Sequence, residues 1–484
     1  MYTIMHVSDL HRSEGDRISN DELLSCLLAD CGRFGTENPP ISWPNAIVIC
    51  GDLIQGLPLG SSDYPTALER QYDEAYDLLT RLADAFVGGD HSKIVIIPGN
   101  HDVDWNMAKA AMVNVEPNKY RIRDLLSNSN SDYRWSWESL QLLEIKNRGT
   151  YDDRFKYFRH LYERFYNGVS HVISPDSKRA WNLFELDDGK IIVCAFNSCT
   201  KTDCFSFFGE IPAQAIAQSH LAVGDKYLLR IAVWHHDVQG PARRFDYIDP
   251  DTIQMMIDKG YRIGMHGHQH KSDAIPYYLH TFEKNTMAVV GTGSLCANTD
   301  QLPTGVRRQY NIIEISENYC QARVHVREMR VRDVFSPGWL VAFDRHSYAD
   351  IEWTSAPPSS PVNAVPSGAI GMMVFEEVEK LIAQKAYEEA TAAIYKANLQ
   401  GLQYGRQLLS EALFRGEMWE KLEDHVSPPR NDDELIKSVL ASIALKHWGK
   451  AEKVLQVAEE SGHFQRMTIL ELRKRLTATK GISL

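Results

Sequence analysis

The chain has 484 residues, of which 44% are hydrophobic and 24% are charged. This composition is typical of globular proteins and excludes a disordered or collagenous chain, and the length predicts two or three domains. The formal net charge of −12 excludes a general attraction to nucleic acid or to anionic membranes. Nucleic-acid binding would therefore need a local basic patch or metal ions.

The sequence contains no stretch of about 18 consecutive apolar residues, which a membrane-spanning helix requires. The N-terminus lacks the basic and apolar regions of a signal peptide. The eight cysteines include no C-x-x-C pair, which favours free thiols in a reducing compartment over a zinc or disulfide framework. We therefore expect a cytoplasmic protein that does not bind membranes.

The first hundred residues alternate between strand and helix patterns. Apolar strands are expected at 2–7, 46–50 and 93–97, with helices at 21–31 and 67–86. This alternation predicts βαβ units and a largely parallel sheet. A polar cluster follows each strand, as is typical of a site at the carboxyl ends of strands.

Residues 105–180 interrupt the alternation and are predicted to form a helical insertion. Within it, four aromatic residues recur at helical spacing between arginines and lysines: Phe155, Phe158, Tyr162 and Phe165. The favoured interpretation is an amphipathic helix that packs its aromatic side on the domain. The alternative is an aromatic and cationic platform for nucleic acid.

Strand patterns return after the insertion. A hairpin around an Asp-Asp-Gly turn is expected first, and a helix is expected at 211–221. The expected strands lie at 181–186, 190–197, 227–234, 262–265, 287–291, 309–315 and 320–331. Together these patterns predict an α/β fold, with a two-sheet sandwich in a catalytic domain that covers residues 1–345.

A linker rich in proline and serine is predicted at 346–368, and residues 369–484 are predicted to form an all-α domain of helical hairpins. Tyr387, Trp419 and Trp448 recur there at spacings of 32 and 29 residues. This spacing is near the period of tetratricopeptide-type helix pairs, and a plain helical bundle is the alternative. Such arrays bind protein partners, so we expect a partner or self-association through this region.

Six short segments each follow a predicted strand. Five of them contain potential metal ligands, and the sixth contains glycines that would let a loop come close to the site. The segments are Asp9-Leu-His11, Gly51-Asp52, Gly99-Asn100-His101-Asp102, His235-His236, Gly267-His268-Gln-His270 and Gly291-Thr-Gly-Ser294. In an extended backbone, residues two apart point the same way, so the members of each D-x-H or H-x-H pair are expected to aim at one spot. The mixture of carboxylate, amide and imidazole groups predicts a two-metal site.

The order of these motifs resembles the calcineurin-like metallophosphoesterase superfamily over roughly residues 1–300. The resemblance implies a β-sandwich flanked by helices and two divalent cations. It implies one cation bound by Asp9, His11, Asp52 and His270, and a second bound by Asp52, Asn100, His235 and His268. It also implies that His101 is a catalytic group that contacts the phosphate and the leaving group without binding metal.

One motif departs from the pattern of this superfamily. Many relatives have prolines after the paired histidines, whereas Asp237-Val-Gln follows here. We expect His235 to be the ligand rather than His236, because His235 directly follows the strand. Asp102 and Asp104 are expected to orient their loop rather than to bind metal.

Imidazole and carboxylate ligands favour Mn²⁺, with Fe or Zn²⁺ as alternatives, over an all-oxygen Mg²⁺ site. The expected reaction is hydrolysis of a phosphodiester by a hydroxide that bridges both metals. The motifs around Asp9 and His101 resemble those of cyclic-nucleotide phosphodiesterases and DNA-repair nucleases, which favours a nucleotide or nucleic acid as substrate. The alternative is a phosphomonoesterase for a phosphoprotein or small molecule, recruited to a partner complex by the helical array.

Several arginine clusters would suit contacts with a phosphate backbone, and solvated surface ion pairs are the equally favoured alternative. They are Arg243-Arg244, Arg307-Arg308, and the group Arg323, Arg327, Arg330 and Arg332.

Overall fold

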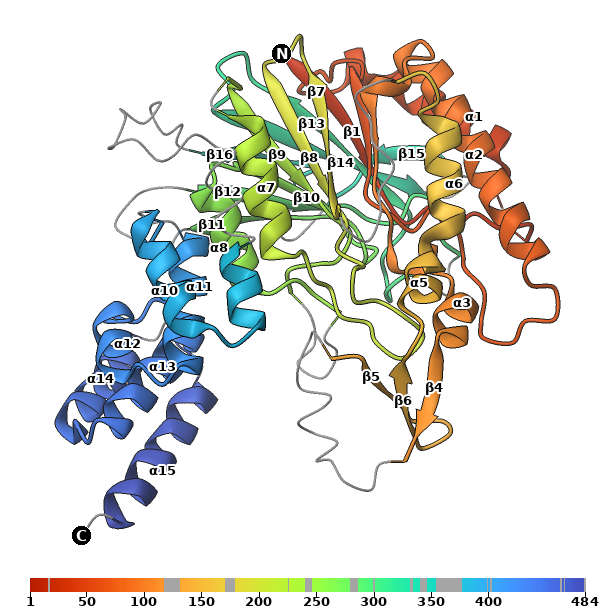
Figure 1. Cartoon of the computed structure of the whole chain (residues 1–484). Helices are drawn as coiled ribbons and strands as arrows, with labels where there is room; N and C mark the ends of the chain where they lie inside the picture. The colour runs from red at the N-terminus through yellow and green to blue at the C-terminus, as the bar shows by residue number, and fades with distance from the viewer. Residues whose placement is uncertain are drawn as a thin grey trace. The chain divides into compact units, whose positions relative to one another are not determined.

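The chain divides into two compact units, Met1–Pro357 and Pro358–Leu484. Figure 1 shows the computed structural model of the whole chain. The structure describes residues 1–15, 18–116, 131–169, 179–224, 226–239, 246–278, 286–298, 301–330, 334–339, 346–353, 377–397, 399–400, 403–461, 464 and 466–482.

The N-terminal unit contains two large sheets. The first has the strand order β15-β14-β13-β1-β2-β3, and β16 also pairs with β14. Strands β1, β2 and β3 are parallel, and the remaining pairs are antiparallel. The strands are β1 (Tyr2–Val7), β2 (Ala46–Ile49), β3 (Ile94–Ile96), β13 (Gln309–Ile315), β14 (Gln321–Arg330), β15 (Val334–Pro337) and β16 (Tyr348–Glu352).

The second sheet has the order β11-β12-β10-β9-β8-β7. Its four central strands are parallel, and β7 and β11 are antiparallel edge strands. The strands are β7 (Trp181–Leu186), β8 (Ile191–Phe196), β9 (Leu229–Val233), β10 (Ile263–His266), β11 (Asp273–Tyr278) and β12 (Thr286–Gly291). The predicted hairpin is present, with Asp187, Asp188 and Gly189 in left-handed backbone conformations at the turn.

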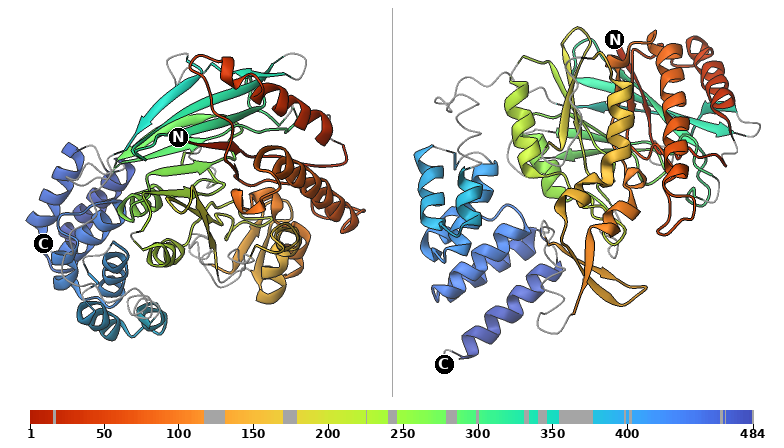
Figure 2. Two further views of the ribbon diagram at one scale, coloured as in Figure 1. Left: turned by 90° about the horizontal axis from the view of Figure 1, so that it is seen from above. Right: turned by 45° about the vertical axis from the view of Figure 1, so that its right-hand side comes forward.

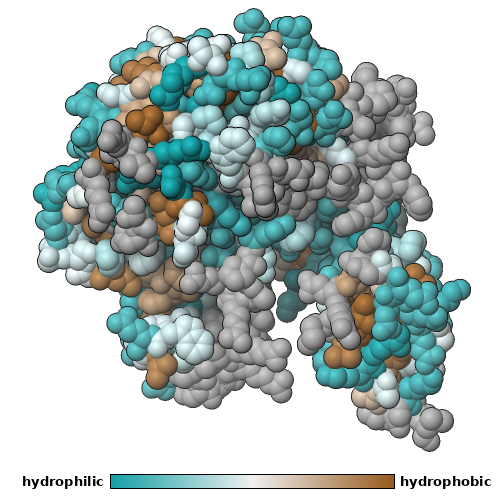
Figure 3. Space-filling view, turned by 180° about the vertical axis from the view of Figure 1, so that it is seen from behind, coloured by the Kyte–Doolittle hydropathy of each residue, from teal (hydrophilic) through white to brown (hydrophobic). Residues whose placement is uncertain are grey.

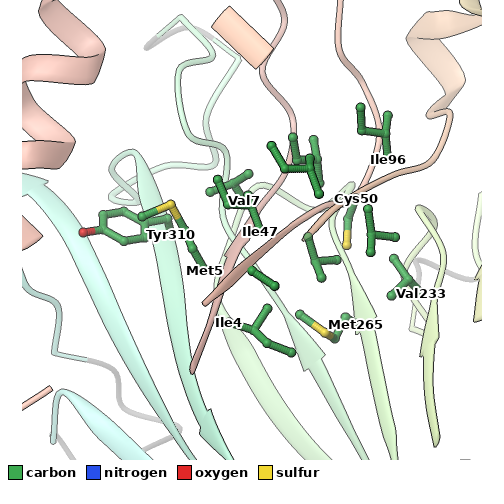
Figure 4. Close-up of a cluster of buried hydrophobic side chains, with 14 of the residues drawn as sticks. Ile4, Met5, Val7, Ile47, Cys50, Ile96, Val233, Met265 and Tyr310 are labelled. Carbon is green, nitrogen blue, oxygen red and sulfur yellow. The ribbon is translucent and has the colours of Figure 1, made fainter. Parts of the chain in front are cut away.

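The two sheets share one hydrophobic core. Ile4 on β1 and Met265 on β10 are both fully buried, although they belong to different sheets. Figure 4 shows these side chains between the strands. On the other side of the first sheet, Tyr310 lies beside Met5 and donates a hydrogen bond from its hydroxyl to Asp30 of helix α1. The sheets therefore form the predicted sandwich.

Helices cover the outer faces of both sheets. Helix α1 packs against β15, α7 packs against β7 and β8, and α8 packs against β11, while α6 packs on α2. The views in Figure 2 show these helices on the outside of the sandwich. The helices are α1 (Asn20–Cys31), η1 (Phe34–Thr36), α2 (Thr66–Val87), η2 (His91–Lys93), η3 (Asn100–Asp102), α3 (Trp105–Ala110), α5 (Arg148–Asp152), η4 (Asp153–Phe155), α6 (Lys156–Phe165), α7 (Ala213–Val223) and α8 (Pro250–Asp258). The predicted α/β fold is confirmed.

The region 105–180 differs from the helical insertion that the sequence predicts. It contains an antiparallel sheet of order β4-β6-β5, formed by Met112–Val115, Gln141–Ile145 and Tyr133–Ser136. These strands are short, and their buried apolar residues belong to one small hydrophobic cluster. Their alternation of apolar and polar residues is therefore too weak to be recognised in the sequence. The amphipathic interpretation of the aromatic stripe is confirmed, because Phe155, Phe158, Tyr162 and Phe165 are all buried.

The region predicted as a linker, 346–368, also begins differently. Residues 348–352 form β16, which pairs with β14 from Gln321↔Glu352 to His325↔Tyr348. Residues 346, 347 and Trp353 are also described, and 354–368 lie outside the described residues. Trp353 is buried in the main core and donates a hydrogen bond from its indole to the carbonyl of Tyr319. The first unit therefore continues beyond residue 345.

The C-terminal unit is all-helical in its described residues. Each helix packs on the next in the chain, and α11 with α13 and α13 with α15 also pack together. The helices are α10 (Tyr387–Lys396), α11 (Gln403–Arg415), α12 (Trp419–His425), α13 (Asp432–Ala444), α14 (Trp448–Ser461) and α15 (Arg466–Ile482). This order of contacts is that of consecutive helical hairpins, as predicted.

The turns before α10, α12 and α14 share one geometry. Tyr387, Trp419 and Trp448 are the first residues of these helices, and they are half-buried. A non-glycine residue with a positive φ angle lies two positions before each aromatic residue. The backbone N–H of the residue directly before each aromatic residue donates a hydrogen bond to the carbonyl five positions earlier. These bonds join Ala386 to Leu381 (2.8 Å), Met418 to Leu413 (2.9 Å) and His447 to Ser442 (2.8 Å). The spacing of the aromatics thus reflects a recurring helix–turn–helix connection.

The surface of the N-terminal unit is mostly hydrophilic in the view from behind, with scattered hydrophobic residues (Figure 3). All eight cysteines are free thiols, as predicted. Across the described parts of the chain, no helix is both long enough and apolar enough to cross a membrane.

Candidate metal centre

The predicted ligands lie just beyond the carboxyl ends of five strands. Asp9 and His11 follow β1, Asp52 follows β2, and Asn100 lies in η3 after β3. In the second sheet the ligands His235, His268 and His270 follow β9 and β10, which are neighbours. Because adjacent parallel strands end at one edge of each sheet, the two sheets bring these side chains together between them.

The backbone at the site is strained. Asp9, His11, Asp52, His268 and His270 all have positive φ angles, between 44° and 75°. Residues other than glycine pay about 1–3 kcal/mol each for such a conformation, which persists where the surrounding structure imposes it. Asp9 and His11 do aim at one spot, as expected, whereas His268 and His270 reach different clusters, and the backbone is extended in neither pair. The strands end before these pairs, and left-handed turns position their side chains.

One cluster of ligand atoms is formed by Asp9, His11 and His270. The Nε2 atoms of His11 and His270 are 3.1 Å apart, and Nε2 of His270 is 3.2 Å from Oδ1 of Asp9. The Nδ1 atom of His270 faces the carbonyl oxygen of Gln301 at 3.0 Å, which orients Nε2 toward the site. These three side chains form one of the groups able to hold a metal ion.

A second cluster is formed by His235, Asn100 and His268. The Oδ1 atom of Asn100 is 2.9 Å from Nε2 of His235 and 3.0 Å from Nδ1 of His268. The two imidazole nitrogens are 3.2 Å apart. The other nitrogen of His235, Nδ1, donates to the carbonyl of Cys50 at 2.7 Å. This bond leaves Nε2 as the atom that faces Asn100 and the site.

Asp52 lies between the two clusters. Its Oδ2 atom is 3.3 Å from Nε2 of His235 and 3.8 Å from Nε2 of His11. Its other oxygen, Oδ1, accepts the backbone N–H of His101 at 2.8 Å. One carboxylate oxygen is thus directed at both clusters, which is the position of a bridging ligand.

The donor atoms fit divalent cations. Metal–nitrogen and metal–oxygen bonds of about 2.0–2.2 Å place neighbouring ligand atoms of one ion roughly 3 Å apart, as observed within both clusters. Two imidazole nitrogens at 3.1 Å can form a hydrogen bond only if one of them carries a proton, whereas a shared cation satisfies both. In addition, Oδ1 of Asp9 is buried, and Nε2 of His270 lies 3.2 Å from it. These residues therefore suit a two-cation site.

The electrostatics favour the cation-binding states of Asp52 and His11, but the protonated state of His235. Burial alone would raise the pKa of Asp52, but the nearby His235 and His101 hold it well below its usual value. Burial, followed by the nearby His101, lowers the pKa of His11 to about 3. For His235, burial is outweighed by Asp52, which raises its pKa to about 9. A cation between Asp52 and His235 would compete with that proton.

His101 lies beside the clusters. Its Nδ1 atom is 2.6 Å from the carbonyl oxygen of Gln55, so Nδ1 carries the proton of this bond. Its ring meets the His11 ring edge-on, with the centroids 4.6 Å apart. One of its ring nitrogens also lies within 4.8 Å of ligand atoms of His11 and Asp52. His101 is therefore close enough to act on a group bound at the site.

The aspartates after His101 hold the loop. Asp102 accepts backbone N–H groups from Gly99 at 2.8 Å and from Leu53 at 3.2 Å. Burial and the neighbouring Asp52 raise the pKa of Asp102 to about 7. Asp104 caps α3 and accepts the hydroxyl of Tyr64 at 2.9 Å. Both carboxylates orient backbone, as the sequence predicts.

His236 packs its ring against His268, with the centroids 4.9 Å apart, but its nitrogens do not meet Asp52 or Asn100. Its Nδ1 atom is 2.9 Å from Oγ of Ser198, and its Nε2 atom is buried without a hydrogen-bond partner among the described residues. Ser198 also accepts the backbone N–H groups of His235 and His236 at 3.2 and 3.3 Å. The geometry therefore places His235, rather than His236, against Asp52 and Asn100.

A sequence comparison identifies the family to which the chain belongs. The profile of the family described as calcineurin-like phosphoesterase matches residues 2–272, which include all the predicted ligands. The chain belongs to the calcineurin-like phosphoesterase family. A comparison with curated protein sequences finds no match.

Several solved structures are similar to this calcineurin-like phosphoesterase at low identity. They include a Vps29 mutant from Entamoeba histolytica (9% identity, 73% of this chain and 99% of that chain, TM-score 0.26) and PhoD (10%, 79% and 78%, TM-score 0.37). The calcineurin-like phosphoesterase YfkN from Bacillus subtilis is 12% identical over 84% of this chain and 98% of its own, with a TM-score of 0.25. At these TM-scores they add no argument, and the assignment rests on the sequence match.

Three supporting residues of this phosphoesterase are not evident from its sequence. Ser198 orients the paired histidines, and the carbonyl groups of Gln55 and Gln301 orient His101 and His270. Ser198 is more than 30 residues from the histidines that it contacts. A backbone carbonyl leaves no mark in the residue type, so only the fold reveals the other two.

The arginine clusters are mostly occupied by structural contacts. Arg327 is buried and pairs with Asp30 at 2.6 Å, and Arg323 pairs with Asp350 at 2.6 Å. Arg308 is buried and donates to the carbonyl of Ala297 at 3.0 Å. Among the predicted clusters, Arg243, Arg244 and Arg332 lie outside the described residues. The surface-pair interpretation therefore fits Arg323, while Arg308 and Arg327 stabilise the fold.

Proposed function

We propose that this protein is a binuclear metal-dependent phosphodiesterase that acts on a nucleotide or nucleic acid. The main support is that the seven predicted ligands come together from five strand ends of two sheets, with the carboxylate of Asp52 between the other six. In this proposal Asp9, His11, Asp52 and His270 hold one cation. Asp52, Asn100, His235 and His268 hold the other. The mixed imidazole and carboxylate set suits Mn²⁺ first, with Fe or Zn²⁺ as alternatives.

When bound, two such cations neutralise charge on the phosphoryl oxygens and lower the pKa of water. The chain supplies the geometry around them. Gln55 holds the Nδ1–H of His101, so that Nε2 is the nitrogen left to meet the substrate. In its protonated form, His101 can donate from Nε2 to the leaving oxygen as a general acid. The backbone N–H of His101 meanwhile fixes the carboxylate of Asp52.

An aromatic pair near the centre favours an ester with a ring-bearing group. Trp105 follows His101 by four residues, and it meets Phe207 edge-on with the ring centroids 6.2 Å apart. Phe207 is 50% exposed. Two residues after it, Gly209 packs so closely on His236 that a Cβ there would lie 2.7 Å from the His236 ring. The exposed ring of Phe207, on a segment that packs against His236, suits stacking of a nucleobase.

The test is an activity panel on full-length protein with added Mn²⁺. The substrates are bis-p-nitrophenyl phosphate, p-nitrophenyl phosphate, cyclic nucleotides, and single- and double-stranded DNA. We expect the diesters to be hydrolysed faster than the monoester, and Asp52→Asn to abolish the activity. Asp73→Asn is the matched control, because Asp73 is exposed and forms a surface ion pair with Arg164. Faster hydrolysis of the monoester, or activity in Asp52→Asn, would refute the proposal.

A second candidate is a phosphomonoesterase that the C-terminal unit recruits to a protein partner. The recurring turns before α10, α12 and α14 favour it, because stacked helical hairpins present extended surfaces for partners or for a second copy of the chain. Preference for p-nitrophenyl phosphate and for phosphopeptides in the same panel would support this candidate over the diesterase.

A further inference from the structure

A second polar cavity lies outside the metal centre. Its volume is about 290 Å³, and it lies where η4 and α6 face the chain segments around residues 197–201 and 210–218. Five cationic side chains line it: Arg134, Arg148, Arg154, Arg159 and Lys201. The acidic side chains in its wall are Asp152 and Glu210. The lining thus holds more cationic than acidic side chains, although Arg134 is paired with the buried Asp203 at 2.6 Å.

Arg154 gives the cavity a buried positive charge. This side chain is only 4% exposed, and its donors bond to the carbonyl groups of Tyr151 (2.9 Å), Thr200 (2.7 Å) and Thr202 (3.1 Å). The carboxylate of Asp152 is 3.9 Å from it, beyond hydrogen-bond distance. Carbonyl groups satisfy the guanidinium hydrogens but carry no full negative charge. The charge of Arg154 is therefore balanced only by carboxylates to which no hydrogen bond from it is observed among the described residues, Asp152 and Asp203.

Lys201 adds a second partly buried charge beside it. Burial lowers the pKa of Lys201, and repulsion from Arg134, Arg148 and Arg154 lowers it further, while Glu210 opposes the shift. Burial likewise lowers the pKa of Arg154. Cations that destabilise one another in this way are stabilised when an anion enters between them.

Two further cations are available at the edge of the cavity. The Arg148 side chain is 55% exposed and pairs with Asp132, and Arg159 is 22% exposed and pairs with Asp153 at 2.9 Å. Exposed ion pairs of this kind contribute little free energy, so either guanidinium can turn to a bound ligand at small cost. Guanidinium groups bind phosphate through paired charge-assisted hydrogen bonds.

The remaining wall is aromatic and amide-bearing. Tyr151, Phe155 and Phe158 line the cavity together with the amides of Asn197, Gln214 and Gln218. An apolar ring and a few polar groups that fix its orientation are typical of small-molecule sites.

We propose that this cavity binds a phosphate-bearing small molecule with a ring, such as a nucleoside monophosphate, at a site separate from the metal centre. The two sites share one segment of chain. Ser198 contacts His235 and His236 of the metal centre, while its neighbours Asn197 and Lys201 line the cavity. A test must therefore distinguish binding at this cavity from binding at the metals. The inference does not depend on the proposed reaction.

The test is calorimetric titration of metal-loaded, full-length protein with AMP, orthophosphate and adenosine. We expect AMP and orthophosphate to bind, and adenosine to bind at least tenfold more weakly than AMP, because charge-assisted hydrogen bonds supply the affinity. Lys201→Met combined with Arg159→Gln is expected to weaken AMP binding at least tenfold, and Lys201→Arg to retain it. Asp52→Asn, which disrupts the metal centre, is expected to retain AMP binding at this site.

Arg164→Gln is the matched control for Arg159→Gln, because Arg164 lies on the same helix and outside the cavity wall. It should leave AMP binding unchanged. Three results would overturn the proposal: no binding of AMP or orthophosphate by the wild type, equal binding of adenosine and AMP, or AMP binding that is lost in Asp52→Asn and unchanged in the Lys201 and Arg159 variant. Thermal unfolding of each variant shows whether it is folded, and Lys201→Arg keeps the test valid if Lys201→Met is unstable.

Discussion

Gly99→Ala is expected to disable the metal centre although Gly99 is not a ligand. A Cβ on Gly99 would lie 2.1 Å from Oδ1 of Asp52 and 2.2 Å from its backbone nitrogen. The backbone of Gly99 has φ −106° and ψ −177°, which alanine adopts without strain. The whole effect of the substitution is therefore steric, and it falls on the carboxylate between the two ligand clusters.

The size of the effect can be worked out from these distances. An ordinary contact needs about 3.4 Å, so Asp52 or the loop of Gly99 must move by roughly 1 Å or more. Metal sites tolerate deviations of only about 0.2 Å in their bond lengths. We therefore expect metal affinity to fall by about 100-fold or more. This loss is at least as large as the loss of metal affinity when a group that hydrogen-bonds a metal ligand is removed. Overpacking should also lower the free energy of unfolding by about 1–3 kcal/mol.

The assay is the metal content of each variant after reconstitution and dialysis, together with titration of Mn²⁺ by calorimetry. Gly35→Ala is the control, because a Cβ at Gly35 meets nothing within 4 Å. It should bind metal as the wild type does. If Gly99→Ala binds two equivalents of metal with wild-type affinity, the close approach of Gly99 to Asp52 does not shape the site and the reasoning is refuted.

Four further results are expected. Metal analysis of reconstituted protein should give about two equivalents, and chelation should abolish hydrolysis; one equivalent with intact ligands would contradict a binuclear centre. His101→Ala should keep both metals and lose roughly 100-fold or more in kcat, since it removes a general acid; loss of metal instead would show that His101 is a ligand. A chain that ends at Pro357 should fold and hydrolyse a small diester at the rate of the full-length protein, because the unit Met1–Pro357 contains every predicted ligand; an inactive, metal-bound fragment would refute this. Burial would raise the pKa of Glu314, but hydrogen bonds from His325 and Ser42 lower it. The stability that Glu314 contributes is therefore lost as the pH falls from about 4.3 through its folded pKa. In Glu314→Gln the urea midpoint should depend less on pH in that range, and a pH profile equal to that of the wild type would contradict the assignment.

Much of the candidate site could be predicted from sequence because its groups come directly after buried strands. The apolar runs at β1, β2, β3, β9 and β10 mark where strands end, and the aspartate, asparagine and histidine residues just beyond those ends mark the ligands. The left-handed turns could not be predicted, because Asp9 and His11 adopt positive φ angles although they are not glycines. The sheet of β4, β5 and β6 was also missed, since its strands are short and their alternation is weak.

The sequence by itself determined the strands that lead into the site and the aromatic side of α6, because hydrophobic periodicity is a local property, and its motifs pointed to the candidate ligands. Only the tertiary structure decided that one oxygen of Asp52 faces both His11 and His235, and that His236 turns to Ser198 instead. It also decided that Arg154 and Lys201 share a cavity. These relations join residues that are tens to hundreds of positions apart, and their distances depend on how two sheets pack, which no local pattern encodes.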